Sequence, residues 1–317
     1  MWFVLTALVV LVAAAELVAR ASGLGRPLLY EKTDYGYRVV PAQELRRFGH
    51  RVSYNAYGMR SEPITPLPAA AVLRIVCVGD SITFGSTAVD QDETYPYRLQ
   101  QLLEAGGAGR YEVLNVSAGG WAIENEEGWL ARHGLFGSRA VVLQLATHDL
   151  FQAPASGDVV GRHPSFPDRR PRFALQELVQ RYLLPRLRDP GEVLYHHNHD
   201  DVVRTMGSLE RIARLVRGQG AELFVLHVEQ PPGVEPDDEL TRYGKAALRA
   251  KVEELRLTLI APAAAVAAEG GRALFFDGLH PNERGNRLLA REVAAAVLQW
   301  TARQQDEGAA GRVAAVR

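Results

Sequence analysis

The sequence predicts an α/β protein in which a central parallel sheet of five strands lies between two layers of helices. Short apolar runs rich in β-branched residues alternate with amphipathic segments from residue 71 to residue 303. Several of these runs end in Gly, Asp, Ser, Asn or His, which are typical of the ligand edge of such a sheet. Hydrophobic residues make up 47% of the 317 residues, so a sizeable core can form.

Strong β-branched runs define the expected strands, and helical periodicity defines the segments between them. Right-handed crossovers between parallel strands then give a flavodoxin-like strand order with helices on both faces. Pro262 should split or kink the longest helical segment. The expected strands are 74–78, 112–116, 141–145, 222–228 and 273–276, and the expected helices are 94–104, 123–133, 202–217, 239–269 and 283–300.

The N-terminal 21 residues are expected to be a membrane segment. Met1 to Ala15 contains no charged side chain, and Glu16 and Arg20 follow it. The stretch is short for a spanning helix but sufficient if Glu16 lies near the membrane interface. A cleaved signal peptide is the main alternative, because Ala13-Ala14-Ala15 has the small-x-small pattern. Its n-region has no basic residue, which favours an uncleaved anchor; a buried first helix is the third alternative.

Two tendencies favour opposite orientations of this anchor in the membrane. The nearest cations, Arg20, Arg26 and Lys32, come after the apolar segment, which by the positive-inside tendency favours a cytoplasmic domain. A large domain after one N-terminal apolar segment is nevertheless usually exported. We therefore expect the domain that follows on the extracytoplasmic side, with a cleaved, exported form as the alternative.

Residues 22–70 are expected to form a stem between the anchor and a domain over residues 71–303. Five prolines limit helix length there, and four tyrosines supply surface for packing. Asn55 to Arg60 indicates a turn that closes a short extended pair, with Gly58 at positive φ. We expect structural roles for Asn55 and Arg60, with a substrate contact as the alternative.

Two further segments stand apart from the alternating pattern. Residues 151–201 are too long for an ordinary connection, so we expect a lid-like insertion over the active-site edge, or else a solvated ornament remote from it. It contains one expected helix near Phe173–Leu184. The tail, residues 304–317, is small and polar enough to be disordered.

Charge and cysteine content exclude some classes of function. The net charge of −1 gives no electrostatic case for nucleic acid as a partner. The single cysteine, Cys77, lies inside the first expected strand and cannot form an intrachain disulfide. It is expected to be a buried hydrophobic residue and not a nucleophile.

Ser81 is the leading candidate for a nucleophile. It follows the strand and the breaking pair Gly79-Asp80, which places its hydroxyl at the carboxyl edge of the sheet. A nucleophilic serine needs a base and an anionic partner for that base, and Asp277 and His280, three residues apart, can supply both. The alternative for Ser81 is a helix N-cap alone.

These motifs resemble those of the SGNH (GDSL) hydrolase superfamily, over most of the chain. Gly79-Asp80-Ser81-Ile82 matches the first block, with Ser81 as the nucleophile, and Asp277 with His280 matches the last. Asn115 and Gly120 match the second block, whose Gly donates its backbone N–H to the oxyanion. The resemblance implies the three-layer α/β/α fold, a Ser–His–Asp triad and an oxyanion hole formed by Ser81, Gly120 and a third donor.

The third block departs from the family pattern Gly-x-Asn-Asp. Ala146 stands for the Gly and His148 for the Asn, while Asp149 is kept. A neutral imidazole still has one N–H, so His148 is expected to replace the Asn as oxyanion donor. The alternatives are that His148 serves a different acceptor, that the site is weakened, or that His148 is a structural histidine.

The motifs and the resemblance therefore predict a serine esterase whose triad needs no cofactor or metal. The resemblance implies a small-molecule or carbohydrate ester as substrate, with an acetyl ester on a cell-envelope carbohydrate as the leading class. An acyltransferase on the same triad and a catalytically weakened carbohydrate-binding module are the alternatives. A metal site in the segment Tyr195–Asp201, which contains three histidines, is disfavoured because adjacent histidines seldom converge on one ion. The sequence makes no prediction of the oligomeric state.

Overall fold

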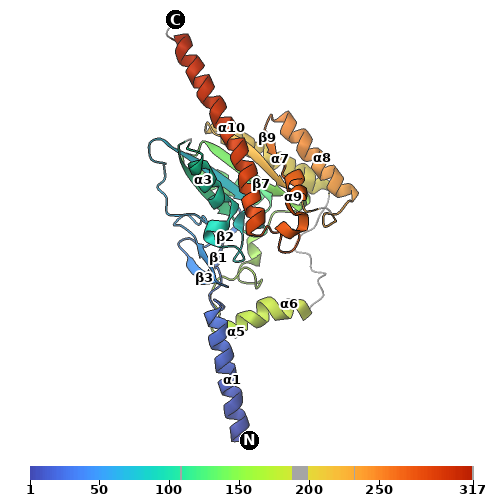
Figure 1. Ribbon diagram of the computed structural model, residues 1–317. Coiled ribbons are helices and arrows are strands. Elements are labelled where there is room, and N and C mark those ends of the chain that lie inside the picture. Colours follow the sequence, from blue (N-terminus) through green and yellow to red (C-terminus); the bar gives the residue numbers. More distant parts are fainter. Residues whose placement is uncertain (108, 188–198, 232, 316–317) are drawn as a thin grey trace.

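Five parallel strands form the central sheet of the computed structural model, which describes residues 1–107, 109–187, 199–231 and 233–315 (Figure 1). The strands pair in the order β6-β5-β7-β8-β9, and every pairing is parallel. All seven residues of β7 are buried, as expected for a central strand covered on both faces. Their bounds are β5 Val72–Gly79, β6 Arg110–Ser117, β7 Ala140–Ala146, β8 Glu222–Val228 and β9 Thr258–Ile260.

Helices cover both faces of the sheet, so the predicted three-layer α/β/α fold is confirmed. Alternate residues of β5 enter two different cores: Val76 and Val78 face one, and Ile75 and Cys77 face the other. Burial raises the pKa of the Cys77 thiol, as expected for a small hydrophobic residue. The first core is covered by α4 (Ile123–His133), α7 (His199–Gly218) and α8 (Glu239–Glu254), and the second by α3 (Tyr95–Ala105), α9 (Ala263–Glu269) and α10 (Glu283–Ala315).

The fifth strand differs from the prediction. It is β9, three residues long, within the segment expected to be one helix over residues 239–269. The helix α8 ends where Arg256 takes a φ of 51°, and Pro262 is the N-cap of the separate helix α9. Residues 273–276 do not form a sheet strand: a 3-10 turn spans Gly271–Leu274, and Phe275 makes one isolated bridge to Pro281. A three-residue strand is too short to interrupt helical periodicity visibly.

Residues 22–70 are part of the core and do not form a separate stem. Two antiparallel hairpins lie here, and buried side chains such as Tyr37, Val52 and Met59 pack in the first core. The turn at Asn55 is present, with Gly58 at φ 77°, but it follows the hairpins and does not close one. The hairpin strands are β1 Tyr30–Thr33, β2 Gly36–Val39, β3 Glu44–Arg47 and β4 His50–Ser53.

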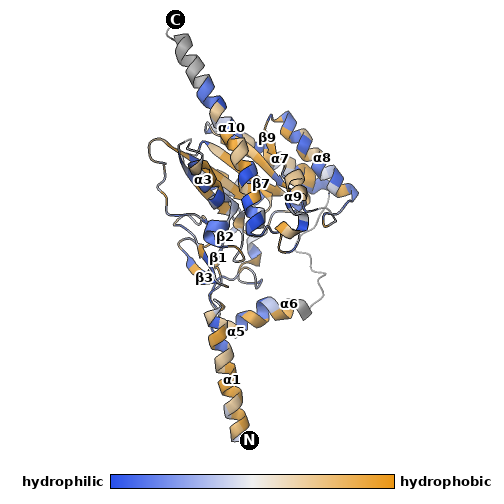
Figure 2. Cartoon of the chain, viewed as in Figure 1, coloured by the Kyte–Doolittle hydropathy of each residue, from blue (hydrophilic) through white to orange (hydrophobic). Residues whose placement is uncertain are grey.

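The N-terminal helix α1, Trp2–Ala21, projects from the domain as a single apolar rod (Figures 1 and 2). It has a mean hydropathy of 2.4, and only 6% of its apolar window is buried in the structure. By length and composition it is able to cross a membrane. An exposed apolar helix of this kind also fits a signal sequence, so anchor and signal stay as the two alternatives.

The long insertion contains the helix expected near residues 173–184, and its expected role as a lid over the active-site edge stays a prediction. Its helical part is continuous, with α5 (Ala174–Glu177), a π-helical turn (Leu178–Leu183) and α6 (Leu184–Leu187). This part packs at the end of α1 and runs across it, away from the sheet (Figure 1). The remaining short helices are α2 (Ser81–Phe84) and 3-10 turns at Gln91–Glu93, Thr147–Phe151 and Gly157–Val159.

Two other predictions fall in this part of the chain or at its end. Residues 195–198 of the histidine-rich segment lie outside the described residues, while His199 contacts the Tyr243 ring and Asp201 pairs with Arg204. The tail predicted to be disordered instead continues α10 as far as Ala315.

Candidate active site

Ser81 lies at the carboxyl end of β5, where the chain turns from strand to helix. The Asp80 carboxylate caps α2 by accepting a hydrogen bond of 2.8 Å from the Ile82 N–H. At position 79, a Cβ would lie 2.3 Å from Thr83 Oγ1 and 2.6 Å from Gln144 Oε1. Only glycine fits there, and this close approach presents the Ser81 hydroxyl at the edge of the sheet.

The structure brings Ser81, His280 and Asp277 into one chain of hydrogen bonds. His280 Nε2 lies 2.9 Å from Ser81 Oγ, and His280 Nδ1 lies 2.7 Å from Asp277 Oδ2. With the Nδ1 proton held by Asp277, Nε2 is the acceptor for the serine proton. The arrangement therefore has the geometry of a nucleophile, a base and the group that orients the base.

The turn from Asp277 to His280 is organised by the Asp277 side chain itself. Its Oδ1 accepts hydrogen bonds from the backbone N–H groups of Leu279 (3.0 Å) and His280 (2.9 Å). Partial burial pushes the pKa of Asp277 upward, but the hydrogen bonds from His280 and Leu279 outweigh this and leave the pKa below its usual value. Asp277 is therefore ionised at neutral pH and able to stabilise an imidazolium.

Gly120 lies in a loop that hairpin residue Tyr37 holds in place. Gly120 itself has a φ of 79°, which favours glycine. The Tyr37 hydroxyl donates to the Gly119 carbonyl (2.6 Å), and Trp121 Nε1 donates to the Tyr37 carbonyl (2.8 Å). Among the described residues, no hydrogen bond from the Gly120 N–H is present, which leaves this donor for a ligand.

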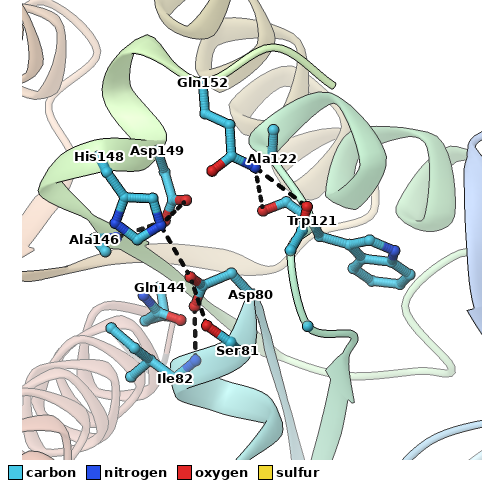
Figure 3. Close-up of polar contacts among 12 residues, drawn as sticks. Asp80, Ser81, Ile82, Trp121, Ala122, Gln144, Ala146, His148, Asp149 and Gln152 are labelled. Carbon is cyan, nitrogen blue, oxygen red and sulfur yellow. Dashed lines mark hydrogen bonds and ion pairs between the residues drawn. The ribbon is translucent and has the colours of Figure 1, made fainter. Parts of the chain in front are cut away.

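His148 lies in the 3-10 turn after β7 and faces two carboxylates near Ser81 (Figure 3). Its Nε2 is 3.3 Å from Asp149 Oδ1 and 3.7 Å from Asp80 Oδ2. The same Asp80 oxygen lies 3.4 Å from Ser81 Oγ. An Nε2 proton on His148 is thus directed toward the carboxylates beside the nucleophile, and its role toward an oxyanion stays a prediction.

Three buried carboxyl groups, those of Asp80, Asp149 and Glu126, lie beneath this part of the site. Burial and the nearby Asp80 charge raise the pKa values of Asp149 and Glu126 well above the usual range. Asp80, His148 and Asp149 also offer one metal-ligand atom each within 4.8 Å of one another. One oxygen of each carboxylate is already used: Asp80 caps α2, and Asp149 accepts from the Ala146 N–H at 2.7 Å.

A Glu126→Gln variant should be more stable than wild type, and increasingly so as pH rises. Glu126 is fully buried, and neither of its carboxyl oxygens has a hydrogen-bond partner among the described residues. Burial raises the pKa of Glu126 in the folded state, so this carboxyl keeps its proton there. In the unfolded state the same carboxyl loses its proton above a pKa of about 4.3. The wild-type free energy of unfolding should therefore fall relative to the variant by up to about 1.4 kcal/mol per pH unit.

Chemical unfolding in detergent micelles at pH 5, 6, 7 and 8 measures this difference. Glu253→Gln, at an exposed position of α8, is the control and should leave a difference that does not change with pH. A pH-independent difference for Glu126→Gln would contradict the prediction.

Arg60 and Tyr37 support the site in ways that the motifs did not show. Arg60 is 2% exposed, and its guanidinium donates to the carbonyls of Phe84 and Ser86, each at 2.6 Å, and of Val89 at 2.7 Å. Burial lowers its pKa to about 10. It thereby fixes the loop after α2, which is a structural role and not a substrate contact. Asn55 likewise holds its own turn by accepting from the N–H groups of Tyr57 and Met59.

The comparisons with known proteins bear on the family. Residues 77–288 match the model of the GDSL-like lipase/acylhydrolase family, which is more than half of the chain. Among curated proteins, none matches the chain. The residues matched by the family model include Ser81, Gly120, His148, Asp277 and His280.

Solved structures similar to this chain include three esterases and lipases of low identity. A lipase from a goat rumen metagenome is 15% identical, with 71% of this chain and 97% of that chain covered and a TM-score of 0.46. An acetyl xylan esterase is 17% identical (71% and 100% covered, TM-score 0.46). A psychrotrophic esterase from Pseudoalteromonas sp. is 14% identical (72% and 98% covered, TM-score 0.44).

The family match confirms the resemblance that the three matching sequence blocks indicated. It covers the end of the strand that leads to Ser81 and the loop that carries His280, and the fold brings these two residues within hydrogen-bonding distance. The chain belongs to the GDSL-like lipase/acylhydrolase family and is a carboxylic ester hydrolase.

Proposed function

We propose that Ser81, His280 and Asp277 are the catalytic triad of this hydrolase. The observation that carries the proposal is the pair of hydrogen bonds from Ser81 Oγ to His280 Nε2 and from His280 Nδ1 to Asp277 Oδ2. His280 takes the proton of Ser81 as its oxygen attacks the acyl carbonyl, and then protonates the leaving alcohol. Water, deprotonated by His280, hydrolyses the acyl-enzyme and releases the acid.

The oxyanion formed at each step needs donors, and the backbone N–H groups of Ser81 and Gly120 are the first two that we assign. The Gly120 N–H is unused within the described residues, and the hydrogen bonds to Gly119 and Trp121 keep its loop in place. His148 is the third donor in this proposal. Its imidazole lies beside Asp80, which contacts Ser81, and takes the position of the family's Asn.

His148→Ala should lower kcat for a short-chain ester by about two orders of magnitude, the usual loss for one oxyanion donor. His148→Asn should keep or raise turnover, because the amide N–H₂ can donate to the same oxyanion. Steady-state kinetics with both variants test this, with the KM values reported separately from kcat. Unchanged turnover in His148→Ala would remove His148 from the oxyanion hole.

The proposed substrate is an acyl ester, with an acetyl group on a cell-envelope carbohydrate as the leading class. The side chains of His280 and Asp277 are 37% and 56% exposed, so the triad is open on the side where a leaving alcohol binds. An open position of this kind can accept a bulky alcohol such as a sugar. Transfer of the acyl group to a second sugar hydroxyl is the alternative outcome of the same acyl-enzyme.

A fluorophosphonate probe tests the proposed nucleophile, because it reacts only with an activated serine. Labelling of the wild type and loss of labelling in Ser81→Ala support the triad, whereas absence of labelling in both favours a carbohydrate-binding module on a weakened site. Release of free acetate from acetylated oligosaccharide, against formation of a newly acetylated acceptor, then distinguishes hydrolysis from transfer.

We also propose that α1 anchors the protein and that the catalytic domain lies outside the cytoplasm. The support is the length, mean hydropathy and exposure of α1. Fusion of alkaline phosphatase after Arg317 tests the orientation, since this reporter is active only outside the cytoplasm. An inactive fusion in intact cells would contradict it, and the intact mass of the purified chain shows whether residues 1–21 are retained.

A further inference from the structure

The helical part of the insertion is joined firmly to the end of α1. Ala174, on α5, packs with Ala19 and Leu24 in a small apolar cluster of its own. The Glu16 carboxylate accepts hydrogen bonds from the backbone N–H groups of Ala174 (2.8 Å) and Leu175 (2.9 Å). α5 therefore begins at the level of Glu16 along α1.

A buried ion pair locks the same joint to the hairpin β3–β4. Arg47, fully buried, pairs with Glu177 of α5 at 2.5 Å and donates to the Tyr182 hydroxyl at 2.9 Å. Glu177 also accepts from the Gly25 N–H at 2.7 Å. Because both charges are buried and hydrogen-bonded, the geometry of α1, α5 and the hairpin is fixed with respect to the domain.

Four apolar side chains of this helical segment and its N-cap are exposed, beside the exposed amide side chains of Gln176 and Gln180. Phe173, Val179, Leu183 and Leu184 are 61%, 42%, 44% and 38% exposed, respectively. The charged groups on the segment from Ala174 to Leu184 lie elsewhere: Glu177 is buried, and Arg181 is 25% exposed and paired with it. Phe48, at the tip of the hairpin and 45% exposed, lies against Tyr182 and extends the same surface. We call these five exposed residues the collar.

Exposed arginines lie on the segments that carry the collar or on segments next to them in sequence. These segments are the end of α1 with the residues after it, the hairpin, and the residues directly before α5. Arg20 donates to the Arg172 carbonyl at 2.9 Å, which places the first and last of these segments together. An apolar surface with exposed arginines on these segments complements the interface of a membrane that contains anionic lipids. The exposed arginines are Arg20, Arg26, Arg46, Arg169, Arg170 and Arg172.

The depth of α1 in a bilayer agrees with this placement. The uncharged stretch before Glu16 has 15 residues, which span about 22 Å as a helix, less than the roughly 30 Å of a hydrocarbon core. Glu16 must therefore lie close to the interface, and so must the helix that it caps. The collar then meets the lipid surface that α1 enters.

We propose that the collar lies on the bilayer as a second membrane contact, with anionic lipid headgroups around it. The proposal rests on the proposed anchoring by α1 and deepens the proposed function.

The position of the candidate site agrees with this contact. In Figure 1, α10 begins on the side of the domain nearer to α1 and runs away from it to the opposite side. Because His280 lies just before α10, the candidate site lies on the side that faces the membrane. Its substrate is then an ester presented at the membrane surface, such as a lipid-linked one.

Spin labels on the full chain, reconstituted in phosphatidylcholine vesicles with and without phosphatidylglycerol, test the contact. A label introduced by Leu183→Cys should collide more with dissolved oxygen than with a water-soluble nickel chelate. A label at Leu102→Cys on α3, a leucine 37% exposed, is the matched control and should show the reverse. The oxygen preference at position 183 should increase with phosphatidylglycerol. A water-like label at position 183 in both lipids would overturn the proposal.

A second experiment measures ester hydrolysis by the double variant Val179→Glu/Leu183→Glu. Its hydrolysis of a long-chain ester embedded in vesicles should fall by about five-fold, because two carboxylates oppose the interface. Its hydrolysis of a soluble short-chain ester should not change, and Leu102→Glu should change neither. Equal hydrolysis of the embedded ester by variant and wild type would contradict the membrane-facing site.

The possible failures are distinguishable. Absence of fluorophosphonate labelling in the wild type would contradict the triad while leaving the oxygen preference of the label at position 183 unaffected. Failure of the intact chain to float with the vesicles would contradict the anchor and, with it, the collar.

Discussion

A Ser81→Ala variant should hydrolyse a soluble short-chain aryl ester with a kcat/KM lower than that of wild type by about four to six orders of magnitude. The Ser81 hydroxyl is the group that lies 2.9 Å from His280 Nε2, and no covalent acyl-enzyme can form without it. Hydrogen-bond donors of the oxyanion hole would still act on a direct attack by water, so a small residual rate is expected.

The measurement is initial-rate kinetics on purified full-length protein, with burst-phase analysis of wild type to detect the acyl-enzyme. Ser165→Ala, a half-exposed serine outside the site, is the matched control and should keep wild-type activity. A Ser81→Ala variant within ten-fold of wild type would show that another group is the nucleophile.

Asp277→Asn should lower kcat by about three to four orders of magnitude, with a smaller change in KM. The Asn side-chain carbonyl can still accept from the N–H groups of Leu279 and His280, so the turn should persist. The amide N–H₂, however, replaces the carboxylate oxygen that holds the Nδ1 proton of His280. The imidazole then favours the tautomer with its proton on Nε2, which cannot accept the serine proton.

The pH profile distinguishes this effect from a general loss of structure. The pKa of Asp277 is lowered, so its carboxylate contributes its stabilisation above its unfolded pKa and loses it only as pH falls through the folded value. The acidic limb of the wild-type kcat profile should therefore not arise from titration of Asp277. Asp237→Asn, an exposed aspartate in an ion pair with Arg242, is the control and should leave the profile unchanged. An equal loss in both variants would contradict the role of Asp277.

The strongly patterned parts of the fold were predictable, and the weakly patterned parts were not. The strands β5, β6, β7 and β8 are buried runs of seven or eight residues, which periodicity identifies directly. β9 has three residues and owes its strand conformation to its pairing with β8. Likewise, the hairpins of residues 22–70 contain four-residue strands whose stability comes from packing against the core.

The insertion shows a different limit. Its proline-rich, arginine-rich start predicted irregular chain, and a helix was expected near residues 173–184. The helix is present at Ala174–Leu187, but its packing on α1 was not predicted. The contacts that place it are an ion pair between Arg47 and Glu177 and a cap by Glu16, over separations of 130 and 158 residues. No local pattern encodes which distant charge a buried glutamate will meet.

By itself, the sequence determined the fold class, the apolar N-terminal segment and the identity of the candidate triad, because each depends on local periodicity or on a short motif. The tertiary structure decided the distance between Ser81 and His280, the supports that Tyr37 and Arg60 give to the site, and the attachment of the insertion to α1. These features depend on which surfaces remain uncovered once the sheet and its helices have packed. That is a property of the whole folded chain, and short segments of sequence carry too little information to specify it.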